Sequence, residues 1–147
     1  MRTKIVLAGE GGQGVQSIAK ILVEAGYEAN KEVLYIPNFG VEQRGGVSIA
    51  FCQIADERIG EPRYSKGDII IMLSDRAIDR CETYVDKNST VVYDTSVCTK
   101  KPTCECKEVI GIDANKIAYT KDNLYDIIAD KILNFFIFTL SFLLYIR

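Results

Sequence analysis

The chain has 147 residues, of which 48% are hydrophobic and 26% charged, a composition typical of a globular domain. Its formal net charge of -2 offers no basic field to nucleic acid or to an anionic membrane, so neither is expected as a partner. The sequence contains no histidine, which excludes Ser-His-Asp triads, Cys-His pairs and histidine zinc sites. If the protein takes part in catalysis, we expect much of the chemistry to belong to another molecule.

The five cysteines form an odd set without the spacing of a disulfide framework. Cys98, Cys104 and Cys106 are clustered, but they match neither paired C-x-x-C motifs nor a ferredoxin run. We therefore expect free thiols near a loop, with a metal or cluster site as the alternative, and we assign no metal ligand and no catalytic residue. The Met1 end shows no signal-peptide series, so we expect a cytoplasmic protein with reduced thiols.

The first part of the chain predicts a β-turn-α-β unit. Residues 4–8 predict a short buried strand, and residues 33–36 predict a second strand that ends at Pro37. Because a right-handed crossover makes such strands parallel, we expect them to be neighbours or near neighbours of one sheet. The helix between them is predicted by an apolar stripe with helical spacing: Val15, Ile18, Leu22, Ala25 and Ala29.

Strands and helices continue to alternate in the rest of the chain. We expect Ser74 to cap a helix that turns Ile78, Cys81 and Val85 inward, and the pattern is helical from Ala114. The remaining strands are predicted at 47–54, 68–73, 89–94 and 108–113, with a polar connection at 55–67. This alternation predicts an α/β fold: a three-layer α/β/α domain over residues 1–147, with a largely parallel sheet and a Rossmann-like first βαβ unit.

The segment "GEGGQG" at residues 9–14 places Gly9, Gly11 and Gly14 on the G-x-G-x-x-G spacing of a dinucleotide-binding turn. In that motif the glycines permit a tight turn, close approach to a phosphate and helix–strand packing. The following helix would offer unpaired N–H groups to an anion. The second strand, however, ends in residues 35–38 without the carboxylate that usually holds the ribose, which disfavours NAD.

A second loop, "PNFGVEQRGG" at residues 37–46, leaves the carboxyl end of its strand as the glycine turn does. In a parallel sheet the two loops then lie at the same end, where α/β proteins place ligands. Arg44 is the one cation in this loop, and Gly45 and Gly46 would let another molecule approach the backbone. The alternative is that Arg44 and Glu42 are merely solvated loop charges.

Taken together, "GEGGQGVQSIAKILVEAGYEANKEV", "PNFGVEQRGGVSIAFCQI" and "DIIIMLSDRAIDR" resemble the gamma subunit, or gamma domain, of 2-oxoacid:ferredoxin oxidoreductases. The resemblance covers roughly residues 3–130 and includes the pyruvate, 2-oxoisovalerate, 2-oxoglutarate and indolepyruvate enzymes. It implies a non-autonomous subunit of an enzyme that decarboxylates a 2-oxoacid oxidatively, forms an acyl-coenzyme A and passes electrons to ferredoxin.

The resemblance also implies where the cofactors lie. Thiamine diphosphate and [4Fe–4S] clusters would be held by alpha and beta partners, with a delta subunit left open, whereas the gamma domain is associated with coenzyme A. The residues carried over as cofactor-binding are Gly9, Gly11, Gly12, Gln13 and Gly14 of the turn, and Arg44, Gly45 and Gly46 of the facing loop.

The chain departs from this family pattern at residues 132–147, where a charge-free apolar run over residues 132–146 suggests truncation or a frameshift. As a helix, the run would span about 22 Å, short of the ~30 Å hydrocarbon core of a membrane. We therefore expect a buried terminal helix or an aberrant terminus. Two rival hypotheses stay open: a stand-alone NAD(P)- or FAD-binding domain, and a tail-anchored binding protein.

Overall fold

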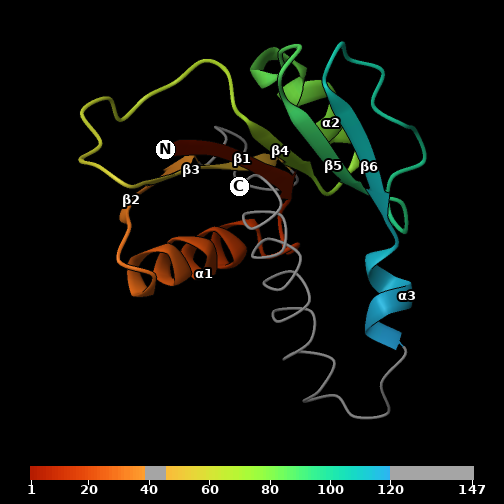
Figure 1. Ribbon diagram of the computed structural model, residues 1–147. Coiled ribbons are helices and arrows are strands. Elements are labelled where there is room, and N and C mark those ends of the chain that lie inside the picture. The colour runs from red at the N-terminus through yellow and green to blue at the C-terminus, as the bar shows by residue number, and fades with distance from the viewer. Residues whose placement is uncertain (39–45, 120–147) are drawn as a thin grey trace. The chain divides into compact units, whose positions relative to one another are not determined.

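The computed structural model describes residues 1–38 and 46–119. Within them, the compact unit Met1–Ile112 holds a mixed six-stranded sheet in the order β2-β3-β1-β4-β5-β6 (Figure 1). The strands are β1 (Arg2–Glu10), β2 (Glu32–Asn38), β3 (Val47–Ala55), β4 (Ile69–Met72), β5 (Thr90–Asp94) and β6 (Glu108–Ile112). The helical elements of this unit are α1 (Val15–Glu28), α2 (Asp75–Cys81) and the 3-10 turn η1 (Glu82–Tyr84).

The sheet is parallel from β1 through β4 and β5 to β6, as predicted. β3 is the exception, since it pairs antiparallel with both β1 and β2. β2 therefore runs in the direction of β1 but is separated from it by one strand. The predicted α/β fold with a largely parallel sheet is confirmed, and the first βαβ unit differs from a Rossmann unit by this inserted strand.

The two helices α1 and α2 cover opposite faces of the sheet, which gives the three predicted layers (Figure 1). Side chains alternate between faces along a strand, and Val6 and Met72 belong to the buried cluster that includes Ile78 of α2. On the other face, Cys52 of β3 pairs in register with Ile5 of β1. The Sγ atom of Cys52 lies 3.8 Å from the carbonyl oxygen of Ala19 in α1. The central strands are thus buried on both sides.

The buried face of α1 is rotated from the predicted stripe. Ile18 and Ala25 are only half-buried and Ala29 is exposed. The buried positions are Val15, Ala19, Leu22 and Gly26. The reason is the glycine at position 26, which has no side chain and lets the helix approach the sheet closely, a contact that an apolar stripe alone does not reveal.

β2 does not end at Pro37 as predicted, because Pro37 pairs in register with Ala50 and the strand continues to Asn38. Proline lacks an N–H and is excluded from the middle of a sheet, but an outer strand needs hydrogen bonds on one side only. Within the described residues β2 is the outer strand next to β3, so the proline is tolerated there.

The connection at 55–67 is more than a polar loop. The hydroxyl of Tyr64 lies 2.6 Å from the carbonyl oxygen of Ile5 and 3.1 Å from that of Cys52, and its ring meets Phe51 edge to face. Burial raises the pKa of Tyr64, so the hydroxyl stays protonated and donates. The side-chain amide of Gln53 adds two hydrogen bonds of 3.0 Å to backbone carbonyls of the connection. This segment is fixed to the sheet.

The predicted cap of α2 is confirmed, because Ser74 Oγ accepts a hydrogen bond of 3.2 Å from the backbone N–H of Ala77. Ile78 and Cys81 are buried as predicted, whereas Val85 is buried but follows η1 rather than lying on the helix.

A second unit, Asp113–Arg147, contains α3 (Ala114–Tyr119) in its described part. The carboxylate of Asp113 accepts a hydrogen bond from the backbone N–H of Lys116 and so caps this helix. No helix in the described residues is long and apolar enough to cross a membrane. The apolar run 132–147 lies outside these residues, and the single domain over 1–147 stays a prediction.

We predict that Gly26→Val destabilises the protein by about 1–3 kcal/mol through overpacking. A Cβ at Gly26 would lie 2.9 Å from Val33 Cγ1 and 3.3 Å from Ile54 Cγ2, whereas a Cβ at Gly60 would meet no atom within 4 Å. Urea denaturation of Gly26→Val beside the control Gly60→Val measures the difference. Equal free energies of unfolding for the two variants would contradict this packing.

Candidate functional site

The glycine turn joins β1 to α1 at the carboxyl end of the sheet, the end at which β1 and β4 finish. Gly12 and Gly14 have φ angles of 94° and 74°, in the left-handed region that residues with a Cβ rarely adopt. The backbone N–H of Gln13 donates to the carbonyl oxygen of Glu10 at 3.1 Å and closes the turn. Glycine is therefore needed at positions 12 and 14 for backbone conformation.

The first turn of α1 presents unpaired amide hydrogens. Gly14 is the N-cap and has no side chain to cap them, and the first helical bond runs from Ile18 N–H to the Gly14 carbonyl at 2.9 Å. The N–H groups of residues 15–17 consequently have no acceptor within the described part of the chain. Together with the positive end of the helix dipole, they form a place where an anion is stabilised.

The glycines of the turn fall into two groups. A Cβ at Gly9 would lie 2.7 Å from Gln13 Oε1 and 2.9 Å from Val15 Cγ2, so Gly9 is required by packing. A Cβ at Gly11, Gly12 or Gly14 would meet no atom of the described residues within 4 Å. These three face open space, where another molecule can reach the backbone.

The side chain of Gln13 is engaged inside the protein. Its Oε1 accepts a hydrogen bond of 2.6 Å from the backbone N–H of Glu10, and its Nε2 donates one of 2.8 Å to the carbonyl oxygen of Leu73. The turn is thereby joined to the residue that follows β4. The sequence motif identified Gln13, but the partner in Leu73 could not be read from it.

The second predicted loop begins and ends at the same end of the sheet as the glycine turn, and it ends beside that turn. Asn38, the last residue of β2, pairs with Ile49, and Val47, the first residue of β3, pairs with Glu10 at the end of β1. The predicted placement at one end of the sheet is thus confirmed for the ends of this loop. Gly46 is half-buried just before β3. Arg44 and Gly45 lie outside the described residues.

A hydrogen-bonded group that could not be predicted from the sequence connects α1 with β2 and β3. Gln16 of α1 donates through Nε2 to Ser48 Oγ at 2.7 Å, and its Oε1 accepts from the hydroxyl of Tyr35 at 2.5 Å. Burial, with a smaller contribution from Cys52, raises the pKa of Tyr35, so that it remains a donor. The group ties α1 to both β2 and β3. Nothing in the spacing of these three residues indicates that they meet.

The inserted strand weakens the dinucleotide hypothesis. A Rossmann site needs the end of the second strand beside the glycine turn, with an acid that holds the ribose. Here β3 separates β2 from β1, which places the end of β2 about 10 Å from β1 at the usual strand spacing. That end carries Pro37 and Asn38 and no acid.

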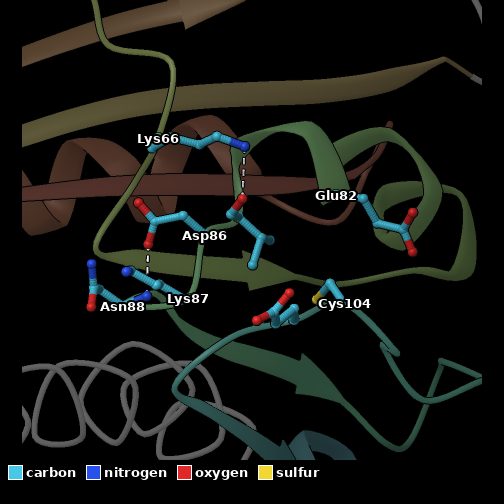
Figure 2. A pocket seen from close by; sticks show the side chains of 8 residues that line it. Lys66, Glu82, Asp86, Lys87, Asn88 and Cys104 are labelled. Carbon is cyan, nitrogen blue, oxygen red and sulfur yellow. Dashed lines mark hydrogen bonds between the residues drawn. The ribbon is translucent and has the colours of Figure 1, made fainter.

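A pocket of about 570 Å³ lies at the opposite end of the sheet, where β4 and β5 begin (Figure 2). Its lining mixes charges of both signs: Lys66, Glu82, Val85, Asp86, Lys87, Asn88, Cys104 and Glu105. Lys66 Nζ donates hydrogen bonds to the carbonyl oxygens of Thr83 and Val85, at 3.0 and 2.8 Å. None of the predicted site residues lines this pocket.

All five cysteines are free thiols. Burial raises the pKa of Cys52 and of Cys81 to about 12, so both remain protonated packing residues. Cys98, Cys104 and Cys106 are half-buried against the α2 side of the core. Across residues 1–38 and 46–119, no group of three or more acidic, cysteine or histidine side chains could hold a metal ion.

Fold and site together define an α/β domain with an open glycine turn and an uncapped helix start at the carboxyl end of its sheet. The chain belongs to the pyruvate ferredoxin/flavodoxin oxidoreductase family, whose model matches residues 4–138. Among its relatives, the ketoisovalerate oxidoreductase subunit VorA of Methanothermobacter marburgensis is 32% identical over 117 residues, which cover 78% of this chain and 24% of that protein. The 2-oxoglutarate synthase subunit KorC of Methanocaldococcus jannaschii is 32% identical over 123 residues, covering 82% and 63%.

Solved structures share the fold. The gamma subunit of a keto/oxoacid ferredoxin oxidoreductase from Geobacter sulfurreducens matches with a TM-score of 0.68 and 23% identity, covering 80% of this chain and 64% of that one. A 2-oxoglutarate:ferredoxin oxidoreductase from Magnetococcus marinus, solved with 2-oxoglutarate, coenzyme A and succinyl-CoA bound, matches with a TM-score of 0.70 and 21% identity, covering 81% and 21%. The chain thus spans less than two thirds of the length of each of these relatives.

We predict that Gly9→Ala and Gly11→Ala differ in stability although both alter the turn. Gly9→Ala forces a methyl group against Gln13 and Val15 and costs about 1–3 kcal/mol, whereas Gly11→Ala enters open space and stays within about 0.5 kcal/mol of the parent chain. Chemical denaturation followed by circular dichroism tests this. A larger loss for Gly11→Ala than for Gly9→Ala would contradict the two groups of glycines.

Proposed function

We propose that this chain is the gamma-type subunit of a cytoplasmic 2-oxoacid:ferredoxin oxidoreductase. The complex oxidatively decarboxylates a 2-oxoacid, transfers the acyl group to coenzyme A and passes the electrons to ferredoxin. Family membership supports this function, as do relatives named as subunits of ketoisovalerate, 2-oxoglutarate and pyruvate enzymes. The observation that carries the proposal for this chain is the open glycine turn, with its unpaired N–H groups at the carboxyl end of the sheet.

The partners follow from the resemblance. Alpha and beta subunits, with or without a delta subunit, hold thiamine diphosphate and the [4Fe–4S] clusters, and ferredoxin meets the assembled complex. This chain contributes no catalytic side chain. Its role is to complete the region in which coenzyme A is held.

The residues of the turn fit a phosphate of coenzyme A. A phosphate is a multiply charged acceptor, and the N–H groups of residues 15–17 are donors without an acceptor in the described residues. Because Gly11, Gly12 and Gly14 have no Cβ and face open space, a phosphate oxygen can approach the backbone. Coenzyme A, when bound, supplies the thiol that accepts the acyl group.

Arg44 and its two following glycines would act from the second loop. That loop leaves β2 and enters β3 at the end of the sheet that carries the glycine turn, and its last residues lie next to Glu10. A guanidinium group there would add charge-assisted hydrogen bonds to a phosphate, or to a carboxylate of the alpha subunit beside it. Both roles require a partner that this chain does not itself provide.

We predict that Arg44→Ala in the reconstituted complex raises the KM for coenzyme A at least about tenfold, or weakens subunit assembly to a similar extent. Loss of one charge-assisted hydrogen bond at a partly desolvated site has that magnitude. Steady-state ferredoxin reduction and size-exclusion chromatography measure the two effects. Arg63→Ala is the matched control, because Arg63 is exposed in the connection between β3 and β4.

Two results would contradict this part of the proposal. If Arg44→Ala and Arg63→Ala both leave the KM and assembly at their parent values, Arg44 has no place in the site. If the isolated chain binds NADH but the complex shows no dependence on coenzyme A, the dinucleotide alternative replaces the proposed function.

A further inference from the structure

We propose that Gln13 is a positioning residue, whose side-chain amide holds the glycine turn in place so that the turn's backbone meets the ligand or partner. This inference rests on the proposed function and refines it. The family resemblance implied that Gln13 belongs to the residues that bind the cofactor. The contacts of its side chain instead point inward, to two backbone groups of this chain.

The hydrogen bond to Leu73 continues the pairing between β1 and β4 beyond the last residues of the two strands. The final backbone bond of this pairing runs from Leu73 N–H to the carbonyl oxygen of Ala8 at 2.9 Å. Past that point β1 continues to Glu10 beside β3 but no longer pairs with β4, so the carbonyl oxygen of Leu73 has no partner in β1. Gln13 Nε2 donates a hydrogen bond of 2.8 Å to this carbonyl oxygen in place of the missing strand partner.

This bond crosses the place where open α/β sheets usually bind ligands. β1 leads to α1 on one face and β4 leads to α2 on the other, so the connections switch faces at the carboxyl ends of these two neighbouring strands. The side chain of Gln13 joins the two strands at this point through its bond to Leu73. We therefore expect a ligand to approach the turn at Gly11, Gly12 and Gly14, where a Cβ would meet no atom of the described residues within 4 Å.

Glutamine fits this role because its amide both donates and accepts. Oε1 takes the N–H of Glu10 while Nε2 reaches Leu73. A glutamate would keep the acceptor but place a charged oxygen against the Leu73 carbonyl. Gly9 completes the arrangement, since a Cβ there would lie 2.7 Å from Gln13 Oε1.

The test compares Gln13→Glu and Gln13→Ala with Gln53→Ala in the reconstituted complex. Gln53 is the matched control: a buried amide that also donates to backbone carbonyls, those of Glu61 and Pro62, on a segment away from the turn. We expect both Gln13 variants to raise the KM for coenzyme A, or the dissociation constant of the subunits, about tenfold with kcat little changed, as loss of the turn's positioning bonds implies. Gln53→Ala should lower the Tm and leave both constants unchanged.

The inference is overturned if the Gln13 variants lower the Tm as Gln53→Ala does while the KM and assembly stay at parent values. It is equally overturned if Gln53→Ala raises the KM as much as they do. A second readout does not depend on the proposed function: ¹⁵N relaxation of the Gly11 and Gly12 amides in the isolated full chain. Gln13→Ala should increase the motion of these amides and Gln53→Ala should not; equal motion in both variants refutes the positioning role even if coenzyme A proves to be the wrong ligand.

Discussion

The constraint on which the rest of the structure depends is the burial of β1 between an antiparallel and a parallel neighbour. Ile5, Val6, Leu7 and Ala8 have no exposed surface, and the strand is packed by α1 on one face and α2 on the other. Burial of such side chains is the main favourable term in folding, about 25 cal/mol per Å² of apolar surface. Because β1 is fixed in this way, the glycine turn that follows it has a fixed starting point.

The residues of the glycine turn have two different roles, although they belong to one sequence motif. Gly9 and Gln13 serve the protein's own packing, through a close contact with each other and a hydrogen bond to Leu73. Gly11, Gly12 and Gly14 leave the backbone open, and Gly14 also leaves the helix start uncapped. In this turn the groups left open to another molecule are backbone groups and not side chains.

Much of the fold could be predicted from local patterns. The central strands appear as apolar runs, and Ser74 marks the start of α2 because a serine before an apolar helical pattern is a common N-cap. The carboxyl end of the sheet could be predicted as the site because both loops leave strands there. The strand order could not: residues 47–55 give the same apolar pattern whether they pair parallel or antiparallel, so the position of β3 between β1 and β2 was not predictable.

The side-chain contacts of the candidate site could not be predicted from the sequence either, because they also depend on the strand order. Gln13 and Leu73 are 60 residues apart, and Gln16, Ser48 and Tyr35 come from three different elements. Single polar residues carry no periodic signal, so their partners become visible only when the sheet has been assembled. The rotation of α1 follows likewise from Gly26 meeting Val33 and Ile54, which are brought together by strand order.

The central claim is that the amide hydrogens at the start of α1 stay free until other molecules supply acceptors. Hydrogen exchange of residues 15–17, measured in the isolated chain and in the complete complex with and without coenzyme A, tests it directly. The account predicts fast exchange in the isolated chain and marked protection in the complex, with a further gain when coenzyme A is added. Amides already protected in the isolated chain, or equally fast in all three states, would contradict it.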